Sequence, residues 1–353
     1  MITETTRIPL RFHRDGTFRI LMLTDLHGGY YASEKLIAGI DALLEHEHPD
    51  LVLFGGDISV GKCYDNGICT PEALRAYLER MLEPLHRRGI PWAHVFGNHD
   101  REAGMSNEEM LPVYESFPLC LSVAGPQEVS GICNYVLPVW SSKIDRDRRA
   151  AYNIFALDSN QYYTGYLKQF GLPADTLTRL EHPVCSGNDA AMPMFDQVMW
   201  YYNTSQRMER ENGAKIPAVM FMHIPTPEHY HCSVNPEQTN LVGCSRESVG
   251  CSEQNTGLFM ACLQRGDVKG IFCGHDHLNT FHAEYCGITL GYAGSIGYDM
   301  STHDELRGGR IIDLDESGGM RTRFVRLLDI MGLDALRAPD FFEGGNKYYI
   351  RNR

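Results

Sequence analysis

The chain has 353 residues, a formal net charge of −13 and eleven cysteines. This length is long for one ordinary domain and short for two large ones. The acidic balance argues against a nucleic-acid scaffold, which would normally carry a basic face. The N-terminus lacks the apolar core of a signal peptide, and no apolar run is long enough to span a membrane, so we expect a cytoplasmic protein.

The cysteines are expected to be mainly reduced core residues. Several of them, such as Cys273, lie within apolar runs, where a thiol packs as a small hydrophobic group. No Cys-x-x-Cys pair occurs, which disfavours a zinc ribbon. Local bridges between Cys63 and Cys69, and between Cys244 and Cys251, stay open, although a reducing compartment disfavours both.

Strand-like and helix-like segments alternate in the first part of the chain. The apolar, strand-like runs are 19–24, 51–54 and 92–96. The segments with helical spacing are 34–47, 71–88 and 106–117. Thr70 is the expected N-cap of the second helix, and Gly89 lies just past its end. This β-α-β-α-β order predicts a largely parallel sheet.

The second part of the chain adds more strands and two long connections. Strand-like runs occur at 132–140, 153–158, 218–222 and 268–273, and four later runs at 280–285, 288–292, 309–314 and 322–327 alternate as antiparallel strands do. We expect one domain over residues 1–328, with insertions near 159–193 and 224–256, followed by a C-terminal extension over 329–353. His229 and His231, inside the second insertion, are expected to face solvent.

Five short polar clusters stand where apolar runs end. They are Asp25-Leu26-His27, Gly55-Gly56-Asp57, Gly97-Asn98-His99-Asp100, His223 and Gly274-His275-Asp276-His277. One histidine or one Gly-Asp pair would mean little, because each is common in turns and on surfaces. In open α/β sheets, however, ligands bind beyond the carboxyl ends of the strands. Five such ends in this order therefore predict one shared pocket.

The clusters offer enough oxygen and nitrogen donors for two divalent cations that share one carboxylate. Imidazole and carboxylate ligands suit Mn, Fe(II), Zn or Co, and their spacing does not choose among these metals. Two-metal sites serve phosphoryl-ester chemistry more often than any other. We therefore expect two divalent transition metal ions and a small phosphorylated substrate.

The pattern D-x-H, G-D, G-N-H-D/E, H and G-H-x-H resembles that of the calcineurin-like metallophosphoesterase superfamily, over roughly residues 18–328. Segments 91–93, 223–228 and 266–269 are similar to its purple-acid-phosphatase-like branch. The resemblance implies an α/β fold, a four-layer α/β/β/α sandwich in which two mixed β-sheets are flanked by helices.

The resemblance also implies a role for each motif residue. The implied ligands are Asp25, His27 and His277 for the first metal, Asn98, His223 and His275 for the second, and Asp57 as the bridge between them. His99 would protonate or stabilise the reacting phosphate, and Asp100 would orient His99 through its other ring nitrogen. Purple acid phosphatases hold ferric iron through a tyrosine three residues after the Gly-Asp aspartate. Val60 stands there in this chain, so an iron-tyrosinate centre is not expected.

The implied activity is the hydrolysis of phosphate esters, most simply phosphomonoesters. A hydroxide bridging the two cations would attack phosphorus, and His99 would act as the acid. A phosphodiesterase or a nucleotide pyrophosphatase could use the same centre, because loops rather than ligands choose the substrate. A non-catalytic protein-binding scaffold is disfavoured because every motif position is intact.

Overall fold

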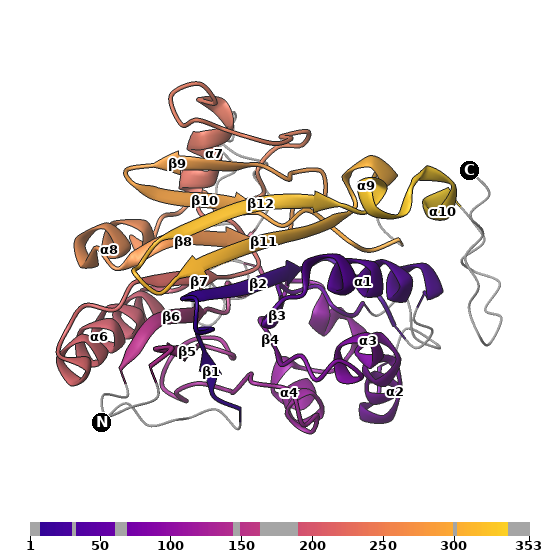
Figure 1. The fold of residues 1–353 in the computed structure, drawn as a ribbon, viewed down its shortest axis with the longest axis horizontal. Coiled ribbons are helices and arrows are strands. Elements are labelled where there is room, and N and C mark those ends of the chain that lie inside the picture. Colours follow the sequence, from indigo (N-terminus) through magenta and orange to yellow (C-terminus); the bar gives the residue numbers. More distant parts are fainter. Residues whose placement is uncertain are drawn as a thin grey trace, which may run out of the picture.

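Two mixed β-sheets and the helices that flank them form the fold (Figure 1). The structure is a computed structural model and describes residues 8–29, 33–60, 69–143, 149–162, 190–298 and 302–337. The predicted four-layer α/β/β/α arrangement is confirmed. One large core cluster joins side chains of both sheets, such as Ile20 and Val52 of one with Ile154 and Phe272 of the other.

The five-stranded sheet carries the N-terminal motifs. Its strands, in spatial order, are β12 (Met320–Arg326), β11 (Gly308–Asp315), β2 (Thr17–Leu23), β3 (Leu51–Phe54) and β4 (Trp92–His94). The three strands β2, β3 and β4 run parallel, as the alternation with helices predicts. Strand β11 pairs antiparallel with both β2 and β12.

Helices from the first part of the chain flank this sheet (Figure 1). They are α1 (Glu34–Glu47), α2 (Pro71–Met81), α3 (Glu83–His86) and α4 (Asn107–Glu115), with the short 3-10 helix η3 (Asp100–Ala103) before α4. The side chain of Thr70 caps α2 as predicted. The helix predicted over 71–88 is instead divided at Leu82, because Pro84 has no N–H to donate to the preceding turn.

The seven-stranded sheet carries the C-terminal motifs. Its strands, in spatial order, are β1 (Leu10–Arg11), β5 (Tyr135–Trp140), β6 (Ala150–Ala156), β7 (Ala218–Phe221), β8 (Val268–Cys273), β10 (Ile288–Tyr292) and β9 (His282–Tyr285). Helices α6 (Phe195–Asn212) and α8 (Leu258–Arg265) pack on it in a second core cluster, in which Val198 and Cys262 join Met220 and Ile271. Strands β9 and β10 form the predicted antiparallel pair, while β10 runs parallel to β8.

Several predictions made for loops and termini are corrected or lie outside the described residues. Helix α7 (Pro227–Val234) crosses the second insertion and buries His229 against Tyr292, so His229 does not face solvent. Cys244 carries a free thiol, which removes the Cys244–Cys251 bridge. Cys63, most of the first insertion and the end of the chain beyond residue 337 lie outside the described residues.

The start of the predicted C-terminal extension is helical. Helix α9 (Leu327–Met331) crosses the predicted boundary and α10 (Leu333–Arg337) lies beyond it, whereas the 3-10 helix η5 (Asp304–Leu306) precedes β11. Leu327 and Leu336 join the large core cluster. The division of the chain at residue 328 stays a prediction. Across the described ranges, no helix combines the length and the apolar character needed to cross a lipid bilayer.

Candidate metal centre

The predicted ligands meet where strands of the two sheets end. Asp25 and His27 follow β2, Asp57 follows β3, Asn98 lies beyond β4, His223 follows β7, and His275 and His277 follow β8. Strands β2, β3 and β4 are parallel in one sheet, and β7 and β8 are parallel in the other. Within each sheet, the carboxyl ends of these strands therefore lie at the same edge. The two sheets therefore contribute donors to a single buried cluster.

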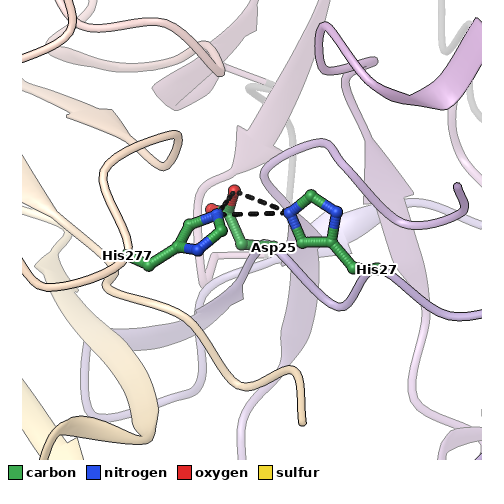
Figure 2. A group of neighbouring side chains, drawn as sticks. All are labelled: Asp25, His27 and His277. Atoms are coloured by element: carbon green, nitrogen blue, oxygen red, sulfur yellow. Dashed lines mark hydrogen bonds and ion pairs between the residues drawn. The ribbon is translucent and has the colours of Figure 1, made fainter. Parts of the chain in front are cut away.

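Asp25, His27 and His277 form the first group of donors, and Figure 2 shows their polar atoms pointing toward one another. The Nε2 atoms of His27 and His277 lie 3.2 Å apart. Asp25 Oδ1 lies 3.2 Å from His277 Nε2 and 3.7 Å from His27 Nε2. Donor atoms that each lie about 2.0–2.2 Å from one transition metal are separated from one another by distances close to these.

A second group of donors surrounds the side-chain oxygen of Asn98. Asn98 Oδ1 lies 3.0 Å from His223 Nε2 and 2.9 Å from His275 Nδ1. Asp57 Oδ2 lies 3.1 Å from His223 Nε2 in this group and 3.6 Å from His27 Nε2 in the first group. Asp57 therefore faces both groups of donors, as a shared ligand would.

The two carboxylates have the contacts that a pair of cations would require. Asp25 Oδ2 accepts hydrogen bonds from the Thr24 hydroxyl and the His275 N–H, and Asp57 Oδ1 accepts one from the His99 N–H. The other oxygens, Asp25 Oδ1 and Asp57 Oδ2, are buried and face histidine rings without a hydrogen bond to them or to other described residues. A buried carboxylate oxygen in that position is costly unless a cation binds it. The residues therefore fit two divalent metals.

Backbone strain is concentrated at the same positions. Asp25, His27, Asp57 and His275 adopt positive φ angles of 53°, 47°, 49° and 74°. Such conformations cost on the order of 1–3 kcal/mol each in residues other than glycine, and they cluster at functional sites. Gly274 is needed for a related reason, since a Cβ there would lie 2.1 Å from Thr24 Oγ1 and 2.6 Å from Asp25 Oδ2.

The charges of the site are strongly coupled. Burial alone would raise the pKa of the Asp25 carboxyl, but His223 and the contacts with His27 and His277 outweigh it and hold that pKa well below its usual range. Burial would lower the pKa of His223, whereas the nearby Asp57 and Asp25 carboxylates raise it to about 10. Burial and His223 lower the pKa of His275 to about 3. Positive charge thus stabilises this cluster of acids.

Asp100 does not contact His99 in the predicted way. Its buried carboxylate accepts four backbone N–H groups at 2.7–3.0 Å, from Asp57, Ile58, Ser59 and Gly97. This arrangement ties the loop after β3 to the loop after β4. The prediction that Asp100 orients His99 is therefore wrong, because the turn after His99 directs Asp100 inward, toward backbone donors.

Three polar side chains near the site were not predicted from the sequence. Glu102 Oε1 lies 2.7 Å from His99 Nδ1. Gln161 Nε2 donates to the backbone oxygen of Asn98 at 2.6 Å, and Asn98 Nδ2 donates to the Tyr162 hydroxyl at 3.2 Å. The His-x-x-Glu spacing was a usable signal for Glu102, since one helical turn places such a pair on one face. No local pattern marks Gln161 or Tyr162.

Comparison with known proteins identifies the family. Residues 18–279 match the family described as calcineurin-like phosphoesterase. The chain belongs to this family. Among its relatives is a probable inactive purple acid phosphatase 14 of Arabidopsis thaliana, which is 29% identical over 83% of this chain and 73% of its own length. Phosphatase DCR2 of Saccharomyces cerevisiae is 26% identical over 77% of this chain and 45% of its own length.

Solved structures share the fold of this calcineurin-like phosphoesterase. A dimetal phosphatase from Danio rerio superposes with a TM-score of 0.54 at 12% identity, covering 88% of this chain and 97% of that chain. GAP50, described as the anchor in the inner membrane complex of Plasmodium, superposes with a TM-score of 0.51 at 11% identity, covering 89% and 86%. Family and fold thus support a phosphatase-type enzyme, whereas several plant relatives are named as inactive.

Proposed function

We propose that the chain is a dinuclear metal-dependent phosphoesterase that hydrolyses phosphomonoesters. The observation that carries this proposal is the pair of buried carboxylate oxygens, Asp25 Oδ1 and Asp57 Oδ2, that face histidine rings and accept no hydrogen bond from the part of the chain that the structure describes. Two groups of donors surround them, and Asp57 faces both. This arrangement supports a two-cation site more strongly than a structural polar cluster, in which buried oxygens are hydrogen-bonded.

The seven donors divide between two cations in this proposal. Asp25, His27 and His277 would hold one, Asn98, His223 and His275 would hold the other, and Asp57 would be shared by both. When bound, the cations would supply positive charge against the phosphate oxygens and a water-derived nucleophile at neutral pH. Manganese, iron and zinc all suit these donors, and Val60 offers no phenolate oxygen for a ferric centre.

We assign to His99 the donation of a proton to the leaving oxygen. Its ring lies beside the first group of donors, with its centroid 5.4 Å from that of His27. Within the described residues, its ring nitrogens contact none of the seven proposed ligands, and 29% of its side chain is exposed. A group that is close to the donors and still open to a substrate suits this role. One positioned acid contributes about 10²–10⁴-fold to the rate.

A non-catalytic scaffold is the second candidate, because plant relatives are named as inactive. The test measures bound metal by elemental mass spectrometry and compares the hydrolysis of p-nitrophenyl phosphate with that of its bis-ester, with Mn²⁺, Fe²⁺ or Zn²⁺ supplied. We expect about two metals per chain and faster turnover of the monoester. Faster turnover of the bis-ester would indicate a diesterase, and protein with neither metal nor activity would favour the scaffold.

A further inference from the structure

The ring of His99 has a carboxylate partner that the family motif does not supply. His99 Nδ1 lies 2.7 Å from Glu102 Oε1, and the two side chains are 29% and 39% exposed. An exposed ion pair of this kind contributes little to stability. Because His99 is the residue to which we assign proton transfer, this contact can instead serve catalysis.

Local backbone geometry explains why Glu102, and not Asp100, contacts the ring. His99 is the N-cap of the 3-10 helix η3, and the Glu102 N–H donates to the His99 carbonyl oxygen at 3.0 Å. In a 3-10 turn, side chains three residues apart lie above one another. Glu102 is therefore held beside His99, while Asp100 is directed toward the backbone N–H groups that it binds.

The contact determines which ring nitrogen of His99 can serve the substrate. An ionised carboxylate only accepts hydrogen bonds, so at 2.7 Å from Glu102 the Nδ1 atom carries the hydrogen. Nε2 is then the nitrogen left for a substrate. A carboxylate on one ring nitrogen fixes both the tautomer and the orientation of an imidazole, as it does in histidine-based acid–base catalysis.

Glu102 is also connected to a proposed metal ligand. The Tyr162 hydroxyl lies 3.4 Å from Glu102 Oε1 and accepts a hydrogen bond from Asn98 Nδ2 at 3.2 Å. Because Nδ2 is occupied in this way, Asn98 Oδ1 faces His223 and His275. One polar network thus reaches from the ring of His99 to the amide of Asn98.

We propose that Glu102 is a positioning residue, which holds the doubly protonated ring of His99 in the orientation that presents its Nε2 proton to the leaving oxygen. The catalytic part of this inference rests on the proposed phosphoesterase function. In the step, the water-derived nucleophile forms a new bond to phosphorus, the phosphorus–oxygen bond to the leaving group breaks, and its electron pair stays on the leaving oxygen. The oxygen takes the Nε2 proton, and the ring, neutral afterwards, keeps its hydrogen on Nδ1 against Glu102.

The kinetic test uses leaving groups of different basicity. Glu102→Gln should lower kcat on glycerol 2-phosphate, whose alkoxide leaves poorly, by about 10–100-fold, which is less than the roughly 10²–10⁴-fold that the proton donor itself contributes. It should change kcat on p-nitrophenyl phosphate much less, because that phenolate needs little protonation, and KM should change little on either substrate. Glu108→Gln, an exposed site on α4, is the matched control and should leave both rates unchanged.

A double variant tests whether Glu102 acts through His99. Residues that act as one unit give strongly non-additive effects. His99→Asn combined with Glu102→Gln should therefore be no slower on glycerol 2-phosphate than His99→Asn alone. Independent, multiplying losses would overturn the proposal, and so would equal losses of Glu102→Gln on the two substrates.

A measurement on metal-free protein makes the test independent of activity. In nitrogen-15 spectra of histidine-labelled protein, the ring signals of His99 are assigned by their absence in His99→Asn. We expect a protonated Nδ1 in the wild type, a changed signal in Glu102→Gln and no change in Glu108→Gln. Unchanged ring signals in Glu102→Gln would overturn the inference, even if the enzyme is active. A chain that shows the expected signals but hydrolyses no phosphate ester would instead overturn the proposed function, and with it the catalytic use of the pair.

Discussion

The backbone N–H of His99 donates to Asp57 Oδ1 at 2.8 Å, so the proposed acid and the proposed bridging ligand are joined by one hydrogen bond. Because Oδ1 is held in this way, Oδ2 is the atom that faces His223 and His27. The backbone of His99 thus sets the orientation of the Asp57 carboxylate. Substitutions at Asp57 and at His99 should nevertheless have different effects, because the Asp57 carboxylate lies within contact distance of His223 and His27, whereas the nearest contact of His99 Nδ1 is Glu102.

We predict that Asp57→Asn loses metal. One carboxylate oxygen is replaced by an amide nitrogen, which does not ligate these cations, and the negative charge between the two groups of donors disappears. The loss of affinity should exceed the roughly 10–100-fold that accompanies removal of a residue behind a ligand. Elemental analysis should find fewer than two metals per chain. Asp315→Asn, at the exposed end of β11, should keep wild-type metal content.

His99→Asn should behave differently. Metal content should stay at the wild-type level, because no ring nitrogen of His99 contacts the other donors among the described residues. Turnover of the best phosphomonoester should fall by about 10²–10⁴-fold, the typical contribution of a general acid. Steady-state kinetics on metal-loaded protein provides the measurement. Wild-type turnover in this variant would show that the assigned role is wrong.

Gly97→Ala should disturb the site without changing a ligand. A Cβ at residue 97 would lie 2.1 Å from Asp57 Oδ1 and 2.4 Å from the backbone nitrogen of Asp57. The backbone atom cannot move away cheaply, so we expect the free energy of unfolding to fall by about 1–3 kcal/mol. Metal content should fall as well, because Asp57 must shift.

Gly319→Ala is the control for this steric effect. Among the described residues its Cβ would meet only Asp315 Cβ, at an ordinary 3.4 Å, and residue 319 does not have a positive φ. Urea titration and metal analysis of both variants give the comparison. Equal losses of stability in the two variants would contradict the steric argument.

Asp100→Asn should act through stability rather than through His99. The carboxylate accepts four backbone N–H groups, and a carboxamide presents a donor to some of them. A buried donor left without an acceptor costs about 1–3 kcal/mol, so the unfolding free energy should fall by at least that amount. A variant of wild-type stability that had lost only turnover would instead restore the orienting role first expected for Asp100.

The positions of the metal donors could be predicted from the sequence because the pattern that marks them is local. An apolar run buried on both faces ends in Asp25, Asp57 or His223, and parallel strands bring such ends to one edge. The sequence did not predict that Glu102, and not Asp100, contacts the ring of His99. Motif identity says nothing about whether a turn is α or 3-10, and that difference decides which side chain lies beside the ring.

Other features depended on tertiary contacts that periodicity does not encode. The alternating pattern of 288–292 predicts an antiparallel strand, yet β10 pairs antiparallel only with β9 and runs parallel to β8 inside the seven-stranded sheet. His229 looked like a loop histidine, but α7 covers β9 and β10 and turns the ring toward Tyr292. Assignment of strands to one sheet or the other likewise depends on pairing partners far apart in the sequence.

A buried histidine away from the metal centre should make stability depend on pH. The ring of His94 is buried, stacks on Tyr114 with centroids 4.1 Å apart, and contacts the Ser122 hydroxyl through Nδ1 at 2.7 Å. Burial lowers the pKa of His94 from its ordinary 6.5 to about 3. The unfolded chain therefore binds this proton at a higher pH than the folded protein does.

The sign of the effect follows from these two pKa values. The stabilisation is complete above about pH 6.5 and is lost as the pH falls toward 3, at up to about 1.4 kcal/mol per pH unit for one proton. We predict that His94→Gln is less stable than wild type at pH 7 but loses less stability between pH 6 and pH 4. Other histidines titrate in both proteins and largely cancel in the comparison. His303→Gln, at an exposed position, should keep the wild-type slope in urea titrations at each pH. Parallel curves for wild type and His94→Gln would mean that His94 is protonated as readily in the folded protein as in the unfolded chain.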